Sequence, residues 1–203
     1  MTGAGRIEEL ASRYLPEYLT PKLKEDLWRE LKDFPSNTRY ILGHDTGDKI
    51  LQGDVFDAVK FINIVDSEIR SSKALVLSNS CDVDPENARD TERMISVAPL
   101  VSLSAYADLL QKKGIARERV ESRVLSIKQQ TVSSMFYLPK AAGLGDDMVV
   151  LFDRVQSQPD SFFWSHKPSL VARLTQYGFY ILLIKLSVHF CRFQENVDRS
   201  VAA

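Results

Sequence analysis

The chain has 203 residues, of which 44% are hydrophobic and 26% charged, and this composition is typical of a folded globular protein and excludes a chain that is disordered throughout. Its formal net charge is −1, whereas dedicated nucleic-acid binders are usually basic, so contact with nucleic acid would require a local basic patch. The two cysteines, Cys81 and Cys191, have neither metal-ligand nor secreted-framework spacing, which favours reduced thiols in a cytoplasmic protein.

Residues 1–48 are expected to form an N-terminal helical extension. Apolar residues recur at steps of three and four in residues 6–19 and again in residues 20–34, which is the period of amphipathic helices. The following segment, residues 36–50, is polar and is typical of a loop or linker, with a short strand over residues 39–42 as the alternative. We therefore expect the main domain to begin near residue 49.

The pattern then changes to that of short strands. Residues 54–63 and 73–77 are rich in Val, Phe, Ile and Leu, and residues 94–97 form a further apolar run. Pro99 is expected to end this third strand, because proline cannot donate a hydrogen bond to a ladder. An acidic loop over residues 81–90 separates the last two strands. Strands of this spacing are typical of a small barrel or a strongly bent sheet.

Residues 103–130 return to helical periodicity, and Gly114 divides them into two predicted helices. This is the most basic part of the chain, with cationic side chains at Lys112, Lys113, Arg117, Arg119, Arg123 and Lys128. A solvated helix face explains such a segment in most proteins, and a nucleic-acid contact is the alternative.

The last third of the chain predicts a hairpin and a helix. Residues 135–139 and 148–153 are expected to pair as strands, followed by a polar connector over residues 156–160. A C-terminal helix is expected over about residues 168–198, and part of it is apolar nearly all round, so it must be covered. The same chain is the expected cover and a homodimer the alternative. Because charged side chains interrupt the apolar run, which falls short of the ~20 residues of a membrane span, we expect no membrane contact.

Four short motifs follow one another between residues 50 and 103: Gly53-Asp54, Ser67-Glu68 with Arg70, Ala74-Leu75-Val76-Leu77-Ser78-Asn79, and Val97-Ala98-Pro99. In this order and spacing they resemble the MazF/PemK family of ribonuclease toxins, over about a quarter of the chain. The resemblance implies an α+β fold in which residues 49–198 form a small SH3-like, MazF-like β-barrel. Its helical additions would be the N-terminal extension, the inserted helices at about 103–130 and the C-terminal helix at about 168–198.

The same resemblance implies an activity. In this family RNA is cleaved by attack of the ribose 2′-hydroxyl, without a metal or cofactor, which requires a base, a cation and a hydrogen-bond donor. Glu68 would be the base, Arg70 the cation and Ser102 the hydroxyl donor. Further RNA contacts would be Lys73, Ser78 and Asn79. A toxin–antitoxin or phage-defence system is the expected setting, with RNA, an antitoxin or other protein, or a second copy as partner.

A non-catalytic module that binds nucleic acid or protein is the alternative hypothesis. The position of the family's usual catalytic threonine is Val101 here, and Ser102, one residue further on, would point to the opposite face of a strand. The acidic loop 81–90 would also lie where RNA approaches. Within this loop we expect Cys81 to be a small buried residue, with a nucleophilic role as the alternative, and the histidine spacing supports no zinc site.

Overall fold

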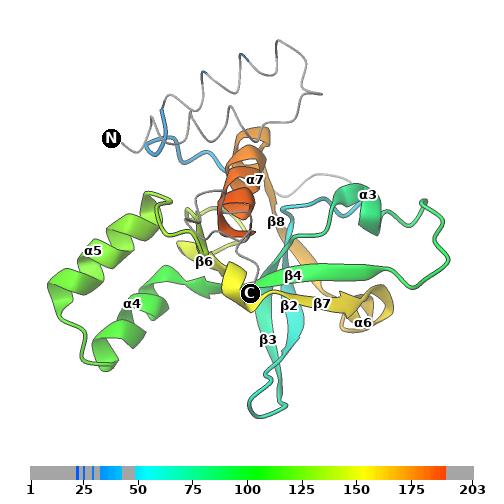
Figure 1. Ribbon diagram of the computed structural model, residues 1–203, viewed down its shortest axis with the longest axis horizontal. Helices are drawn as coiled ribbons and strands as arrows, with labels where there is room; N and C mark the ends of the chain where they lie inside the picture. The colour runs from blue at the N-terminus through cyan, green and yellow to red at the C-terminus, as the bar shows by residue number, and fades with distance from the viewer. Residues whose placement is uncertain (1–21, 23–24, 26–28, 30–32, 43–48, 191–203) are drawn as a thin grey trace, which may run out of the picture.

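Figure 1 shows the computed structural model, which describes residues 33–42 and 49–190 together with Lys22, Glu25 and Arg29. Over these residues the predicted α+β class is confirmed, because an eight-stranded antiparallel sheet is combined with five α-helices. The helices predicted over residues 6–19 and 20–34 lie almost entirely outside the described residues.

The strands follow one another along the sheet in the order β1-β8-β2-β3-β4-β6-β5, and β7 pairs with β4 beside β6. They are β1 (Ile41–Leu42), β2 (Val55–Ile62), β3 (Ile69–Val76), β4 (Met94–Ser102), β5 (Met135–Leu138), β6 (Met148–Leu151), β7 (Gln156–Pro159) and β8 (Ser169–Leu174). The helices are α3 (Ser80–Val83), α4 (Leu103–Lys112), α5 (Arg117–Lys128), α6 (Asp160–Ser165) and α7 (Gln176–Phe190), with a 3-10 turn η1 (Phe152–Arg154). No backbone ladder of the described residues joins the end strands β1 and β5, so the sheet is not closed and the predicted small barrel is not confirmed.

One side chain links two strands whose backbones do not pair. Gln156, at the start of β7, accepts a hydrogen bond from the Ile62 amide at 3.0 Å and donates one to the Ile62 carbonyl at 2.7 Å. The side-chain amide of Gln156 thus makes the two backbone hydrogen bonds at Ile62 that a neighbouring strand would otherwise make. Strands β2, β3 and β4 contribute Phe56, Ile95 and most of the other members of a small core, which Val83 of α3 and Phe163 of α6 complete.

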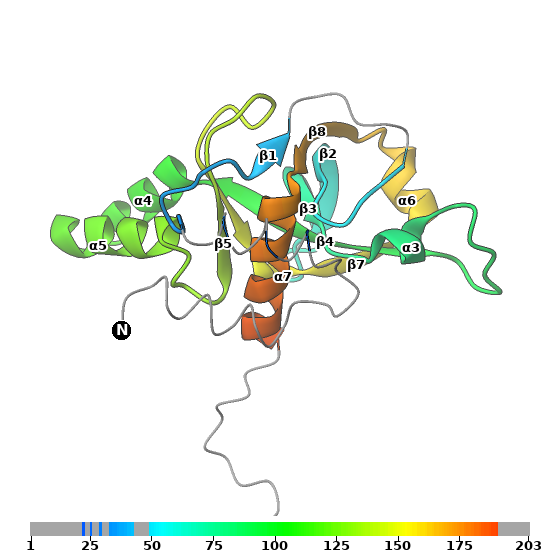
Figure 2. The ribbon, with the colours of Figure 1, turned by 90° about the horizontal axis from the view of Figure 1, so that it is seen from above.

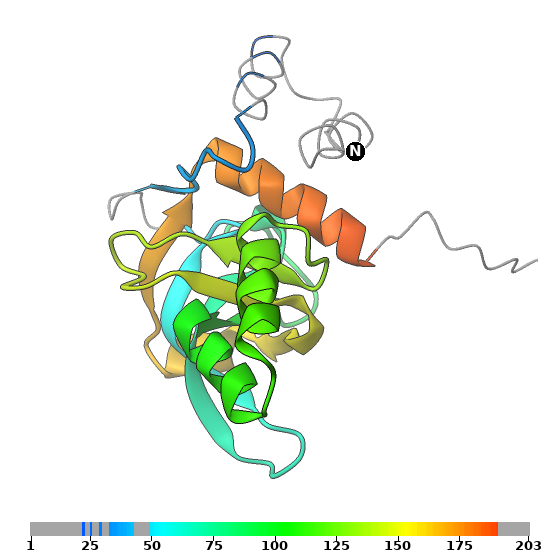
Figure 3. The same ribbon diagram turned by 90° about the vertical axis from the view of Figure 1, so that its left-hand side faces the viewer.

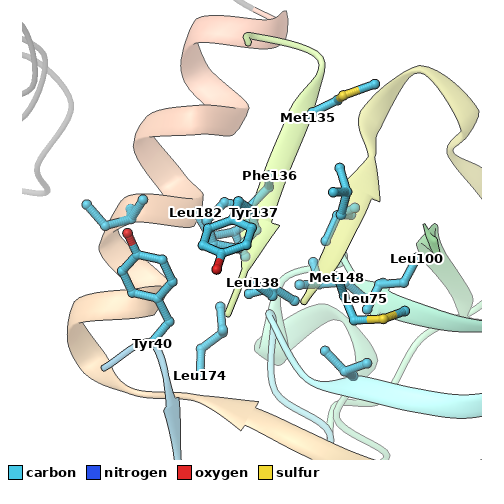
Figure 4. Close-up of a cluster of buried hydrophobic side chains, with 14 of the residues drawn as sticks. Tyr40, Leu75, Leu100, Met135, Phe136, Tyr137, Leu138, Met148, Leu174 and Leu182 are labelled. Atoms are coloured by element: carbon cyan, nitrogen blue, oxygen red, sulfur yellow. The ribbon is translucent and has the colours of Figure 1, made fainter. Parts of the chain in front are cut away.

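A second, larger core lies beneath α7. Figure 3 shows this helix lying along one side of the sheet, and Figure 4 shows Leu182 of α7 close to Phe136 and Tyr137 of β5. Phe34 and Tyr40 are buried in this core as well. The prediction that the same chain covers the apolar C-terminal helix is therefore confirmed for residues 176–190.

The predicted start of the C-terminal helix, at about residue 168, is wrong. Residues 169–174 form β8, which pairs with both β1 and β2, and the helix starts only at Gln176. Thr175 caps it, since the Thr175 hydroxyl accepts a hydrogen bond from the Gly178 amide at 3.0 Å. Gly178 lets the helix approach β1, because a Cβ at this position would lie 2.4 Å from the Tyr40 carbonyl oxygen.

Two further predictions are corrected around β4. The polar connector predicted at residues 156–160 is β7, which pairs with the first half of β4. Pro99 does not end the third strand, since β4 continues to Ser102. The Leu77 amide donates to the Ser96 carbonyl, so the backbone of Ser96 faces β3. Because orientations alternate along a strand, the nitrogen of Pro99, three residues further on, faces away from β3. On this other side of β4 the pairing with β7 ends at Val97 and the pairing with β6 begins at Leu100, so no N–H is needed at Pro99.

The predicted hairpin and the two inserted helices agree with the structure. β5 and β6 form the predicted antiparallel hairpin, with Met135 opposite Leu151. The inserted segment forms α4 and α5, and Gly114 between them has a φ of +80°, a value that favours glycine. Among the described residues, none of the helices is long and apolar enough to cross a membrane.

Candidate functional site

Glu68 and Arg70 lie together near the tip of the β2–β3 hairpin, which projects from the body of the protein in Figure 1. One guanidinium nitrogen of Arg70 is 2.5 Å from an Asp66 carboxylate oxygen and 3.2 Å from a Glu68 carboxylate oxygen. All three residues are exposed to solvent. The predicted base and cation are therefore neighbours, in an exposed network of low energetic value.

Ser102 has a structural role at the start of α4. Its hydroxyl caps the helix at the Ala105 amide and donates a 2.6 Å hydrogen bond to the Asp146 carboxylate, which also accepts one from Ser104 at 2.9 Å. These hydrogen bonds, first that of Ser102 and then that of Ser104, lower the pKa of the Asp146 carboxyl. No hydrogen bond or ion pair within the described residues joins Ser102 to Glu68 or Arg70.

The predicted RNA contacts are spread along β3. Ser78 accepts a 2.8 Å hydrogen bond from the Ser96 amide, and Asn79 caps α3 by accepting a 2.9 Å hydrogen bond from the Cys81 amide. Both lie just beyond the end of β3 that is far from Arg70. An extended chain rises by about 3.3 Å per residue, so the eight residues from Arg70 to Ser78 correspond to about 26 Å. Lys73, near the middle, pairs with Asp57 at 3.4 Å. The structure therefore does not bring the six predicted residues together as one site.

Asp54 of the Gly53-Asp54 motif forms a buried ion pair with Arg173. Asp54 is fully buried, and its two carboxylate oxygens each accept a 2.7 Å hydrogen bond from Arg173 of β8. The Leu51 amide donates to the same carboxylate at 2.8 Å, and Arg173 donates to the Lys49 carbonyl. The sequence pattern does not reveal Arg173 as the partner, because it predicts a helix there and the two residues are 119 positions apart.

The strongest local charge lies on α4 and α5. Residues 103–128 contain six Lys or Arg and three Asp or Glu, a net charge of +3 in a chain whose net charge is −1. Arg117 pairs with Glu121 and Lys128 with Asp147. Four exposed cations remain whose side chains form no hydrogen bond or ion pair with described residues, and we call them the α4–α5 surface: Lys112, Lys113, Arg119 and Arg123. Figure 2 shows these helices at one end of the protein, away from α3 and α6.

The acidic loop lies at the other end of the protein. Its first residues form the short helix α3, and Cys81 is exposed there, so the prediction of a buried cysteine is wrong. Lys49 pairs with Asp84 and Glu86 of this loop. Within the described part of the chain, no three His, Cys, Asp or Glu side chains are grouped so that they could hold a metal ion.

A scan against models of known protein families finds no match for this chain, and a search of curated proteins finds none either. A function is therefore inferred from the arrangement of the chain's own residues.

Proposed function

We propose that this protein is a non-catalytic module that binds nucleic acid, RNA in particular, through the α4–α5 surface. The observation that carries the proposal is the group of four exposed cations with no partner among the described residues. Free Lys and Arg side chains bind phosphates and release the counterions condensed on the nucleic acid. The resemblance of residues 50–103 to RNA-cleaving toxins favours RNA as the ligand.

The surroundings of the predicted catalytic residues favour binding over cleavage. Arg70 is already paired with two carboxylates, so the group of Asp66, Glu68 and Arg70 has a net charge of −1. A phosphate that approached Arg70 would meet these anions as well. The Ser102 hydroxyl is likewise occupied by Asp146. In contrast, a phosphate on the α4–α5 surface would displace only water from the cations.

A metal-independent ribonuclease of the MazF/PemK type is the second candidate. The 3.2 Å contact between Glu68 and Arg70 supports it, because a base and a cation beside one exposed phosphate are what attack by the 2′-hydroxyl requires. The bridge from Gln156 to Ile62 adds support for a related architecture, since it links β2 to β7, which pairs with β4, and β2 and β4 share a core.

The first prediction concerns affinity for RNA. The variant Arg119→Glu/Arg123→Glu is expected to bind single-stranded RNA at least about tenfold more weakly at moderate salt. The slope of log K against log salt should fall by about 1.4, since each lost phosphate contact contributes about 0.7 for single strands. Fluorescence anisotropy with a labelled oligonucleotide measures both quantities.

A matched control changes the net charge by the same amount elsewhere. Arg89→Glu/Lys167→Glu reverses two exposed cations near α3 and α6, and it should retain nearly all of the affinity. An equal loss in both variants would show that the α4–α5 surface has no specific role. Binding that does not change with salt would overturn the proposal outright, because contacts to phosphates are always salt-dependent.

The second prediction separates the two candidates. Incubation of the protein with long single-stranded RNA in EDTA is expected to leave the RNA intact, as judged on denaturing gels. If the RNA is cleaved, and if Glu68→Ala and Arg70→Ala each abolish the cleavage, the ribonuclease is the correct assignment. The α4–α5 variant serves as the control, because it should weaken binding without removing the predicted base and cation.

A further inference from the structure

One edge of the sheet is open along the projecting hairpin. β4 pairs with β3 only at residues 74–76 and then turns to pair with β6. Along residues 69–71, β3 is therefore paired on one side alone, with β2, and no described residue forms a ladder with its other edge. Exposed edges of this kind are templates for the addition of another strand.

The backbone groups that face this open edge can be assigned. The Asn63 amide donates to the Glu68 carbonyl, so the backbone of Glu68 faces β2, and because orientations alternate along a strand Arg70 does the same. The N–H and C=O groups of Ile69 and Ser71 therefore point outward. On the equivalent edge of β2, the outward groups of Ile62 are taken by Gln156, which leaves β3 as the available edge.

The side chains along this edge are complementary to themselves. On either side of Ile69, Glu68 is acidic and Arg70 is basic. If two such strands run antiparallel about a two-fold axis at Ile69, each Glu68 lies opposite the Arg70 of the other copy. That pair is a non-hydrogen-bonded one, in which opposite side chains are closest. Ile69 meets its own counterpart, and the outward groups of Ile69 and Ser71 find partners.

We propose that a second copy of this chain adds to the open edge of β3, antiparallel and centred on Ile69. An acidic or a basic partner strand would match only half of the edge, whereas a second copy matches both halves, as a two-fold interface requires. The hairpin also exposes apolar side chains, with Ile64 87% and Val65 95% accessible and Ile62 and Ile69 about half accessible. A second hairpin beside the first covers part of this surface. The interface is separate from the α4–α5 surface and does not depend on the proposed function.

Charge exchange at the interface tests the proposal. Sedimentation velocity of the full chain at increasing concentration should show a monomer–dimer equilibrium. The single variants Glu68→Arg and Arg70→Glu each place like charges opposite each other in both 68–70 pairs of the dimer. Each variant should therefore weaken dimerisation at least about tenfold. The double variant Glu68→Arg/Arg70→Glu restores opposite charges and should restore dimerisation. A chain that stays monomeric at every concentration, or single variants that dimerise like the wild type, would overturn the proposal.

Cross-linking tests the register independently of the charges. In a Cys81→Ser/Cys191→Ser background, Ile69→Cys should form an intermolecular disulfide, since the paired Cα atoms would be about 5.5 Å apart. Ser71→Cys is the matched control, because its counterpart would lie about 13 Å away along the strand. Rapid cross-linking at residue 71 but not at residue 69 would contradict the proposed axis. Both experiments measure mass and not RNA binding, so their failure is distinguishable from failure of the proposed function.

Discussion

Replacing Asp54 by alanine is expected to lower the free energy of unfolding by about 3 to 5 kcal/mol. The carboxylate of Asp54 is fully buried and receives both hydrogen bonds of the Arg173 fork at 2.7 Å. Without it, the Arg173 side chain, which is only 8% exposed, loses both of these hydrogen bonds and the opposite charge of Asp54 in the interior of the protein. A loss of this size is a large part of the 5–15 kcal/mol that stabilises a typical domain.

The loss of stability in Asp54→Ala should come from the broken ion pair with Arg173. In the double variant Asp54→Ala/Arg173→Leu neither charge of this pair is left buried, so part of the stability should return. Lys73→Ala, which breaks the partly exposed and longer 3.4 Å pair with Asp57, is the control and should change stability by less than about 1 kcal/mol. Urea unfolding followed by tryptophan fluorescence measures all four proteins. If Asp54→Ala is as stable as Lys73→Ala, the ion pair does not stabilise the fold as described.

The stability of the protein is expected to rise between about pH 7 and pH 10 because of Lys185. This lysine of α7 is 5% exposed, and its ammonium nitrogen donates to the carbonyls of Gln130 at 2.9 Å and Val132 at 2.5 Å. No carboxylate is bonded to it among the described residues. Burial lowers the pKa of Lys185 from 10.5 to about 7.

The unfolding free energy rises with pH because the folded and unfolded states bind different numbers of protons. Below pH 7 Lys185 is charged in both states, and its contribution does not change with pH. Between pH 7 and 10.5 the folded protein holds the neutral amine while the unfolded chain holds the ammonium, so the unfolded state binds more protons. The free energy of unfolding should therefore rise by about 1.4 kcal/mol per pH unit, up to about 5 kcal/mol in total.

Lys185→Met isolates this contribution. The variant should be less sensitive to pH than the wild type across this range, because it cannot take up the proton on unfolding. His189→Gln, on the same helix, is the control and should keep the wild-type dependence. The measurement is the difference in unfolding free energy at a series of pH values. Parallel curves for the wild type and Lys185→Met would show that Lys185 is charged in the folded protein up to pH 10.

Local patterns predicted the elements whose partners are near in sequence. The β5–β6 hairpin and the pair α4 and α5 depend on turn residues such as Gly114 and on the period of apolar side chains, both of which are visible in a short window. The strands β2 and β3 were found in the same way. The adjacency of Glu68 and Arg70 follows from their separation of two residues along an extended segment, with Glu68 directly before β3 and Arg70 in it.

The candidate sites depended on more than local pattern. The spacing of the motifs predicted one site, yet Arg70 and Ser78 lie at opposite ends of β3, because a strand places residues eight apart about 26 Å from each other. Ser102 has the predicted hydroxyl, but the Asp146 carboxylate, distant in sequence, occupies it. The free cations of the α4–α5 surface were visible as a basic segment, and only the contacts of their neighbours showed which of them are unpaired.

Composition, periodicity and the order of short motifs predicted the α+β class, the basic character of residues 103–128 and the need to cover the apolar C-terminal helix, because all of these can be read along the chain. In contrast, only the folded arrangement shows that residues 169–174 are a strand, that residues 156–159 pair with β4 and that Arg173 neutralises Asp54. In each case a ladder or a buried charge pair joins residues far apart in sequence. The free energy of those contacts outweighs local propensity, which differs by less than about 1 kcal/mol per residue between most side chains.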